Sequence, residues 1–220
     1  MARLECGILG LPQARQLVFN PIGSGRAGRR QVGKCRLVDK GQDTGMKLSQ
    51  LSRLSPRWAA RAMRMGFNLH PAFRATGGRV VFVAPDLLHI RVRLALTRRT
   101  RNLVGSIYGG SLFAVTDGVH AGMLMARLGS DVIVWDKAAT IRYRKPAFHT
   151  LTADFRLSEA ELRDIREALR RDHETERTYP VELKGPDGTV HTEVQRTLYL
   201  ADKAWYKQHK LRHGAAGDPT

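Results

Sequence analysis

The sequence has little cysteine, few acidic residues and no long apolar run. Its 220 residues include two cysteines, Cys6 and Cys35, so neither a disulfide framework nor a thiolate metal site is indicated. No apolar stretch reaches the length of a transmembrane helix, about 18 residues. The start of the chain also lacks the apolar core and small-residue cleavage site of a secretory signal. We therefore expect a cytoplasmic protein.

Several catalytic motifs are missing as well. The chain has no Gly-x-Ser-x-Gly nucleophile elbow, no Cys-x-x-Cys pair and no phosphate loop of the Gly-x-x-x-x-Gly-Lys-Ser/Thr type. The corresponding nucleophile, metal and nucleotide systems are therefore not indicated. We expect no metal and no cofactor.

The charge balance is strongly basic. Lys and Arg number 37 against 20 Asp and Glu, which gives a formal net charge of +17. Between residues 46 and 100 the net charge is +10, because Asp86 is the only acid among eleven basic residues: Lys47, Arg53, Arg57, Arg61, Arg64, Arg74, Arg79, Arg91, Arg93, Arg98 and Arg99. This balance favours nucleic acid, an anionic membrane or a phosphate-bearing ligand as partner, but an arginine-rich solvated surface explains it equally well.

Composition divides the chain into four parts. Residues 1–45 are rich in Gly and Arg without a sustained hydrophobic period, so we expect a disordered and dispensable extension. Residues 46–76 show two basic amphipathic helices, the second opening on a Ser-Pro pair that suits an N-cap and first helical position. These helices are expected to pack on the domain, the alternative being contact with a membrane or nucleic acid. Residues 77–202 form the folded domain, and 203–220 a basic tail.

Hydrophobic periodicity within residues 77–202 predicts six strands and two helices. The strands are expected over 79–84, 88–96, 132–145, 149–157, 178–183 and 190–200, and the helices over 111–128 and 159–171. The helix over 111–128 is apolar on nearly all sides, which is typical of a buried helix. The predicted fold class is α+β: an antiparallel sheet of about five to six strands wrapped around one long central helix, as in a hotdog fold.

The candidate chemistry lies between Asn102 and Asp117. A polar loop leads to the pair Gly109-Gly110 at the start of the central helix, where a ligand can approach the backbone amides because no Cβ is in the way. Asp117 follows among apolar residues. Burying an unpaired carboxylate is costly, so Asp117 should be paired, shifted in pKa or placed at a cavity. A base needs one of the last two, whereas a structural carboxylate paired with an arginine is the alternative.

This pattern resembles a known family. The spacing of Asn102, Tyr108-Gly109-Gly110 and Asp117 is similar to the Asn…His-Gly-Gly…Asp motif of PaaI-like acyl-CoA thioesterases of the hotdog superfamily. The resemblance covers about residues 70–202 and includes the strand end over 141–147. Residues 105–112 and 134–137 resemble still more an uncharacterised hotdog family that is grouped with the thioesterases. The resemblance implies a hotdog fold and hydrolysis of an acyl-CoA thioester to a carboxylate and coenzyme A.

The resemblance also implies catalytic roles. Asp117 takes the place of the carboxylate that acts as general base on water or as nucleophile on the thioester carbonyl. Gly109 and Gly110 offer a backbone amide to the developing oxyanion. Asn102 stands where a polar side chain helps to hold water or substrate. The site forms between two subunits, so the resemblance implies a homodimer, or a tetramer built from it, with Asp117 facing the glycine loop of the partner.

Substrate binding is assigned to Tyr108, Asp136, Arg144 and Lys145. Tyr108 replaces the histidine of the family motif, a departure that affects substrate scope. Asp136 falls near a position that often carries Ser or Thr. Arg144 and Lys145 could receive the phosphates of coenzyme A, with a solvated surface as the alternative for each.

Two alternatives concern neighbouring chemistry and the function as a whole. His120 could hydrogen-bond Asp117 from one turn away, but a satisfied core histidine is the favoured interpretation. The alternative function is a non-catalytic hotdog protein that binds acyl-CoA or fatty acyl groups, which Tyr108 favours. A third hypothesis is binding to nucleic acid or an anionic membrane through the basic segment.

Overall fold

The computed structural model describes residue 51 and residues 54–213. The extension predicted over 1–45 lies outside the described residues. Helix α1 spans Pro56–Leu69, with Ser55 at the N-cap and Pro56 as its first residue, as predicted. Residues 71–75 form the short helix α2 (Pro71–Ala75), which Pro71 opens in the same way. No helix in the described ranges is long and apolar enough to cross a membrane.

Six antiparallel strands form one sheet, in agreement with the predicted architecture. The strands are β1 (Gly78–Val83), β2 (His89–Leu94), β3 (Val132–Tyr143), β4 (Leu151–Arg156), β5 (Glu174–Lys184) and β6 (Val190–Asp202). Their order in the sheet is β1-β2-β4-β5-β6-β3, so β1 and β3 are the edge strands. The edge at β1 is covered by α1, because the Asn68 side chain donates to the carbonyl of Val80 and accepts from its amide, both at 2.9 Å.

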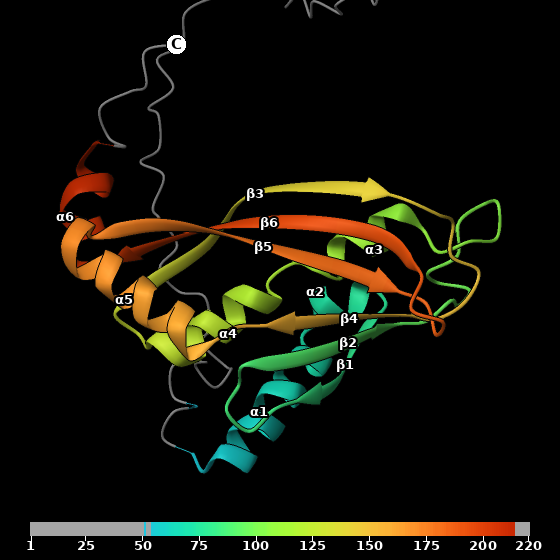
Figure 1. The fold of residues 1–220 in the computed structure, drawn as a ribbon, viewed down its shortest axis with the longest axis horizontal. Coiled ribbons are helices and arrows are strands. Elements are labelled where there is room, and N and C mark those ends of the chain that lie inside the picture. The colour runs from blue at the N-terminus through green and yellow to red at the C-terminus, as the bar shows by residue number, and fades with distance from the viewer. Residues whose placement is uncertain (1–50, 52–53, 214–220) are drawn as a thin grey trace, which may run out of the picture. The chain divides into compact units, whose positions relative to one another are not determined.

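The central helical segment consists of two helices rather than the single helix predicted over 111–128. Helix α3 spans Gly109–Ala114 and α4 spans Val119–Leu128. The turn between them contains Asp117 and ends at Gly118, whose φ of 71° is a left-handed conformation that favours glycine. Figure 1 shows the strands of the sheet curving around α4. Almost the whole surface of α4 is buried, as its apolar sequence predicts.

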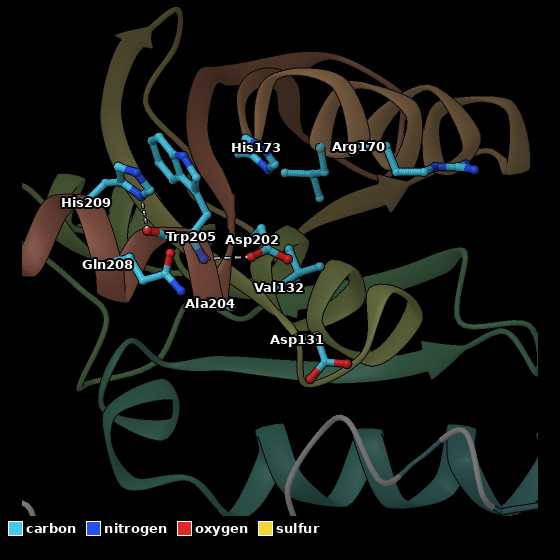
Figure 2. Close-up of a pocket in the computed structure, with 10 residues that line it drawn as sticks. Asp131, Val132, Arg170, His173, Asp202, Ala204, Trp205, Gln208 and His209 are labelled. Atoms are coloured by element: carbon cyan, nitrogen blue, oxygen red, sulfur yellow. Dashed lines mark hydrogen bonds between the residues drawn. The ribbon is translucent and has the colours of Figure 1, made fainter.

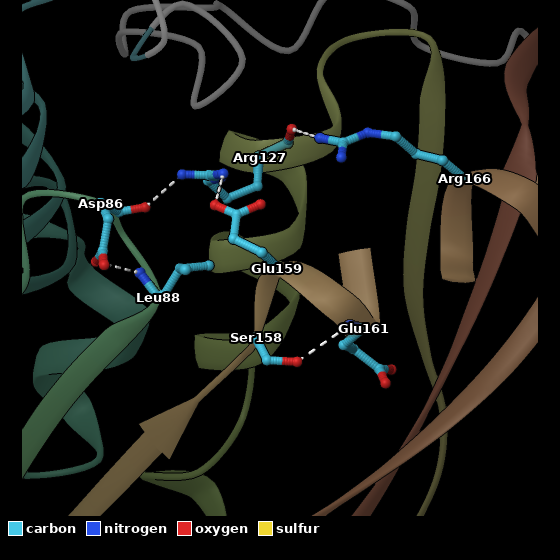
Figure 3. A network of polar contacts seen from close by, with 7 residues as sticks. All are labelled: Asp86, Leu88, Arg127, Ser158, Glu159, Glu161 and Arg166. Atoms are coloured by element: carbon cyan, nitrogen blue, oxygen red, sulfur yellow. Dashed lines mark hydrogen bonds and ion pairs between the residues drawn. The ribbon is translucent and has the colours of Figure 1, made fainter. Parts of the chain in front are cut away.

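Helix α5 (Glu159–Asp172) is fixed at its N-terminus by a polar network (Figure 3). The Ser158 hydroxyl accepts from the Glu161 amide at 3.0 Å, so the predicted N-cap is present. Arg127 at the end of α4 donates to the Asp86 carbonyl at 2.7 Å and pairs with Glu159. These contacts tie together the β1–β2 turn, α4 and α5. The segment from 203, expected to be a tail, begins with helix α6 (Lys203–His213).

His120 on α4 is a buried core histidine, as favoured from the sequence, but its hydrogen-bonding capacity is not fully satisfied among the described residues. Its ring stacks on Tyr179 at 4.5 Å and meets the ring of Phe155 edge-on at 5.1 Å. Burial lowers the pKa of His120 from 6.5 to about 4, although a backbone hydrogen bond with Arg156 partly opposes the shift. Its Nδ1 has no hydrogen-bond partner among the described residues. The ring therefore resists protonation in the folded state.

We expect stability to fall on acidification because of His120. Above pH 6.5 the ring is neutral in both the folded and the unfolded state. Between pH 6.5 and 4 the unfolded chain binds the proton and the folded chain does not, so the free energy of unfolding drops by about 3 kcal/mol. Urea unfolding of His120→Leu should lose this part of the pH dependence, whereas the exposed control His70→Gln should keep it. The expectation would be contradicted if the free energy of unfolding depended on pH in the same way for wild type and His120→Leu.

Candidate functional site

Asp117 lies in the turn between α3 and α4, on the rim of an apolar cavity. The cavity has a volume of about 640 Å³ and is lined mainly by α1 and α2, with Phe67, Phe73 and Ala114 among its walls. The Asp117 side chain is 61% exposed in the single chain, in contrast to the buried position expected from its apolar neighbours. Its carboxylate pairs with the Arg196 guanidinium at 3.3 Å. Both the ion pair and the cavity considered from the sequence are therefore present.

Arg196 on β6 is the buried residue that organises this region. The residue is 5% exposed. Its guanidinium donates to the Thr116 hydroxyl at 3.1 Å and to the Phe113 carbonyl at 3.0 Å, and it lies 4.5 Å from the Phe113 ring centroid. A second carboxylate, Asp136, lies 3.5 Å away on the adjacent strand β3. Arg196 thus holds the end of α3 and two carboxylates in one cluster.

Sequence reasoning missed Arg196, although a signal was available. Positions 194, 196, 198 and 200 of β6 all point inward, and three of them are Val or Leu. A charged residue in the inward register of an otherwise apolar strand requires a partner, because an unpaired buried charge is costly. That argument predicts a carboxylate opposite Arg196.

Asp136 reaches Arg196 through an irregularity in β3. The register between β3 and β6 shifts between Asp136 and Ala138, so Lys137 is an extra residue in the ladder. Lys137 pairs instead with Glu176 on β5. Burial and then the neighbouring Asp117 carboxylate raise the pKa of Asp136, while Arg196 opposes the shift. The Asp117 and Asp136 carboxyl groups are therefore electrostatically linked across one guanidinium.

Asn102 is engaged by its own loop. Its side-chain oxygen accepts from the amides of Val104 at 3.1 Å and Ser106 at 3.0 Å, and its Nδ2 donates to the Ser106 hydroxyl at 2.8 Å. These bonds close the loop that precedes α3. The geometry gives Asn102 a clear structural role in shaping the loop.

The glycine pair opens α3 between two tyrosine rings. The Tyr143 hydroxyl donates to the Gly109 carbonyl at 3.2 Å. A Cβ on Gly110 would lie 2.3 Å from Cε1 of Tyr108, so glycine is required for this ring position. As first residues of α3, Gly109 and Gly110 have amides without an intrahelical acceptor. Tyr108 itself is exposed.

The candidate residues fall into two groups within one chain. Asn102, Gly109, Arg144 and Lys145 line a second hollow, of about 330 Å³. Asp117 and Asp136 lie in the Arg196 cluster. Asp117 follows Gly109 beyond the end of α3 and lines the other cavity. The two groups therefore belong to separate hollows within one chain.

A further hollow of about 630 Å³, next to α6, is lined by none of the candidate residues (Figure 2). The Trp205 ring is stacked between His173, at 5.8 Å, and His209, at 5.0 Å. Both faces of the indole are thus occupied. No cluster of three or more His, Cys, Asp or Glu that could hold a metal occurs among the described residues.

An antiparallel sheet curved around a buried helix, with a carboxylate at the start of that helix, defines this chain as a hotdog protein. Within that class the chain belongs to the DUF4442 family, a domain of unknown function, whose model matches residues 59–200. A search of curated proteins finds no match.

Solved structures share the fold at low sequence identity. A probable thioesterase of unknown function from Pseudomonas aeruginosa is 20% identical with a TM-score of 0.58, over 64% of this chain and 95% of its own. A protein of unknown function from Chlorobaculum tepidum is 12% identical with a TM-score of 0.57, and the match covers 69% of this chain and 99% of the other. A thioesterase from Haemophilus influenzae is 11% identical with a TM-score of 0.50, and the match covers 66% of this chain and 91% of the other. These similarities support the hotdog fold.

Proposed function

We propose that this protein is a thioesterase that hydrolyses an acyl-CoA to a carboxylate and coenzyme A. The observation that carries the proposal is the Asp117 carboxylate, which Arg196 holds at the rim of a 640 Å³ apolar cavity. An acyl chain occupies the cavity, because its walls are largely apolar side chains of α1 and α2. The thioester then lies at the rim, within reach of Asp117. The thioesterases among the structures with this fold agree with the proposal.

In the proposed mechanism, Asp117 acts as general base. Its carboxylate removes a proton from water, and the water oxygen attacks the thioester carbonyl carbon. The amides of Gly109 and Gly110 from a second subunit stabilise the oxyanion of the tetrahedral intermediate. Collapse breaks the carbon–sulfur bond, and the leaving thiolate takes up the proton that Asp117 removed from water. Arg144, which pairs with Glu193 at 2.8 Å, and Lys145 are exposed at the second hollow, and in this proposal they bind the coenzyme A phosphates.

The proposed site requires a homodimer, and the edge strand β3 supports one. This strand has 12 residues and ends the sheet at the side opposite to β1. Most of its residues are exposed in the single chain, including Trp135 at 51%. A long edge strand with an exposed aromatic ring favours pairing with another copy. We expect sedimentation equilibrium to give twice the mass of one chain; a monomer at assay concentration would contradict the two-subunit site.

A panel of acyl-CoA substrates of increasing chain length tests the function through release of the free thiol. Turnover that requires Asp117 supports the thioesterase. The second candidate, a non-catalytic protein that binds acyl-CoA, is favoured by Tyr108, whose exposed ring lies over Gly110. Saturable binding across the panel without thiol release would identify this candidate and reject the enzyme.

A further inference from the structure

The outer face of α1 carries a stripe of exposed apolar side chains. Trp58, Met65 and Leu69 are 60%, 60% and 63% exposed. Together with Ala62 they recur at the i, i+4, i+7 and i+11 spacing that places residues on one helix face. The side of α1 that packs on the domain is formed by other residues: Ala59, Ala60 and Met63. Helix α1 therefore has one apolar face in the core and a second in solvent.

A shallow hollow of about 720 Å³ follows this outer stripe. Its walls are mainly apolar, and they include Leu54 as well as Trp58, Met65 and Leu69. Exposed apolar area of this kind on a basic protein marks an interaction surface rather than an ordinary solvated face. The hollow also contains basic side chains, which restrict the kind of partner that fits.

Arginines flank the apolar stripe. Arg57, Arg61 and Arg64 follow one another along one side of α1, and Arg79 of β1 lines the same hollow. All four are exposed, and none forms a salt bridge within the described part of the chain. No acidic residue occurs in the sequence between α1 and Asp86. The Arg61 guanidinium lies over the Trp58 ring, 5.1 Å from its centroid, so charge and apolar surface meet at one point.

We propose that the outer face of α1 docks this protein on anionic lipid bilayers. Trp58, Met65 and Leu69 enter the boundary between headgroups and acyl chains, and the flanking arginines contact headgroup phosphates. A nucleic-acid backbone would use the arginines alone and would leave the apolar stripe in water. The combination of an apolar stripe with a basic flank that forms no salt bridge among the described residues therefore favours the bilayer.

The position of α1 connects this surface with the apolar cavity. Ala62 and Gly66 line both the outer hollow and the cavity whose rim carries Asp117. On the proposed thioesterase function, docking places the acyl cavity beside lipid from which an acyl chain can enter. The docking itself does not depend on that function, since Trp58, Met65 and Leu69 line the outer hollow and not the cavity.

Co-sedimentation of the full chain with vesicles tests the proposal. Vesicles of equal parts phosphatidylcholine and phosphatidylglycerol should bind the protein, and vesicles of phosphatidylcholine alone should bind it much more weakly. The double variant Trp58→Ser/Met65→Ser should lower the partition coefficient about tenfold without a change in charge. The triple variant Arg57→Gln/Arg61→Gln/Arg64→Gln should also lower the partition coefficient and reduce the salt dependence of binding.

The matched control is Arg163→Gln/Arg170→Gln/Arg171→Gln on α5, which removes the same charge and should bind as wild type.

Four results would overturn the docking surface. The first is the absence of binding to anionic vesicles at low salt. The second is full binding by Trp58→Ser/Met65→Ser, which would show charge adsorption alone. The third is DNA binding that exceeds vesicle binding and depends on the arginines but not on Trp58. The fourth is a change in molecular mass on Trp58→Ser/Met65→Ser substitution, which would identify the face as a contact between copies. Circular dichroism verifies that each variant is folded, so a loss of binding is interpretable.

Discussion

Asp117→Asn is expected to lower the rate of thioester hydrolysis by about 10²–10⁴-fold, the contribution of a positioned general base. Asparagine keeps the size of the side chain but cannot take a proton from water. The fold should persist, because the Asp117 side chain is 61% exposed and Arg196 retains Asp136 as a partner. Thiol release from the best substrate of the acyl-CoA panel measures the effect, and urea unfolding verifies that stability is preserved.

The matched control for Asp117→Asn is Asp164→Asn, the same substitution at an exposed position of α5. It should leave hydrolysis unchanged. An Asp117→Asn protein with wild-type turnover would show that the carboxylate is structural, a partner for Arg196 and nothing more. Turnover that is lost only together with the fold would also remove the argument for a base.

The fold could be predicted from the sequence wherever one local rule applied to a whole element. The alternation of apolar and polar residues predicted β2, and a serine N-cap followed by an apolar stripe predicted α5. The break between α3 and α4 could not be predicted in this way. Apolar residues continue on both sides of Thr116, Asp117 and Gly118, and a single glycine is compatible with an uninterrupted helix. Tertiary contacts decide the break, since Arg196 binds the carbonyl of Phe113 at the end of α3.

The candidate site also has one part that could be predicted from the sequence and one part that could not. Asn102 and Gly109 are close along the chain, so their neighbourhood could be predicted, whereas Lys145 reaches the same hollow only through the fold. The cluster around Arg196 depends on strand register and on the extra residue in β3. A period-2 pattern carries no signal for such a bulge, so the direction of Asp136 could not be predicted. A paired Arg196 could have been predicted, because it is a charged residue at an inward-facing position of an otherwise apolar strand.

Removal of Arg196 should be the most damaging change to stability among the residues of this cluster. Arg196→Met keeps much of the apolar stem but removes the guanidinium, so Asp117 and Asp136 face each other without a counter-charge. The Thr116 hydroxyl also loses the Arg196 donor, and the Phe113 carbonyl keeps the hydroxyl and amide of Thr116 as donors. We expect the free energy of unfolding to fall by about 2–3 kcal/mol, less than for a fully buried pair because both carboxylates keep some exposure. Urea unfolding at one fixed protein concentration measures it.

Arg91→Met is the matched control, because Arg91 on β2 also bonds a carboxylate, Asp154, with two nitrogens but keeps a 47% exposed side chain. Its loss should cost less than about 1 kcal/mol, as for exposed ion pairs. Arg196→Lys should fall between the two, since it restores the charge without the planar fork that serves several acceptors at once. If Arg196→Met and Arg91→Met lowered the free energy of unfolding equally, burial would not increase the contribution of Arg196 to stability. A larger loss for Arg196→Met, combined with reduced turnover, would identify Arg196 as the residue that positions Asp117.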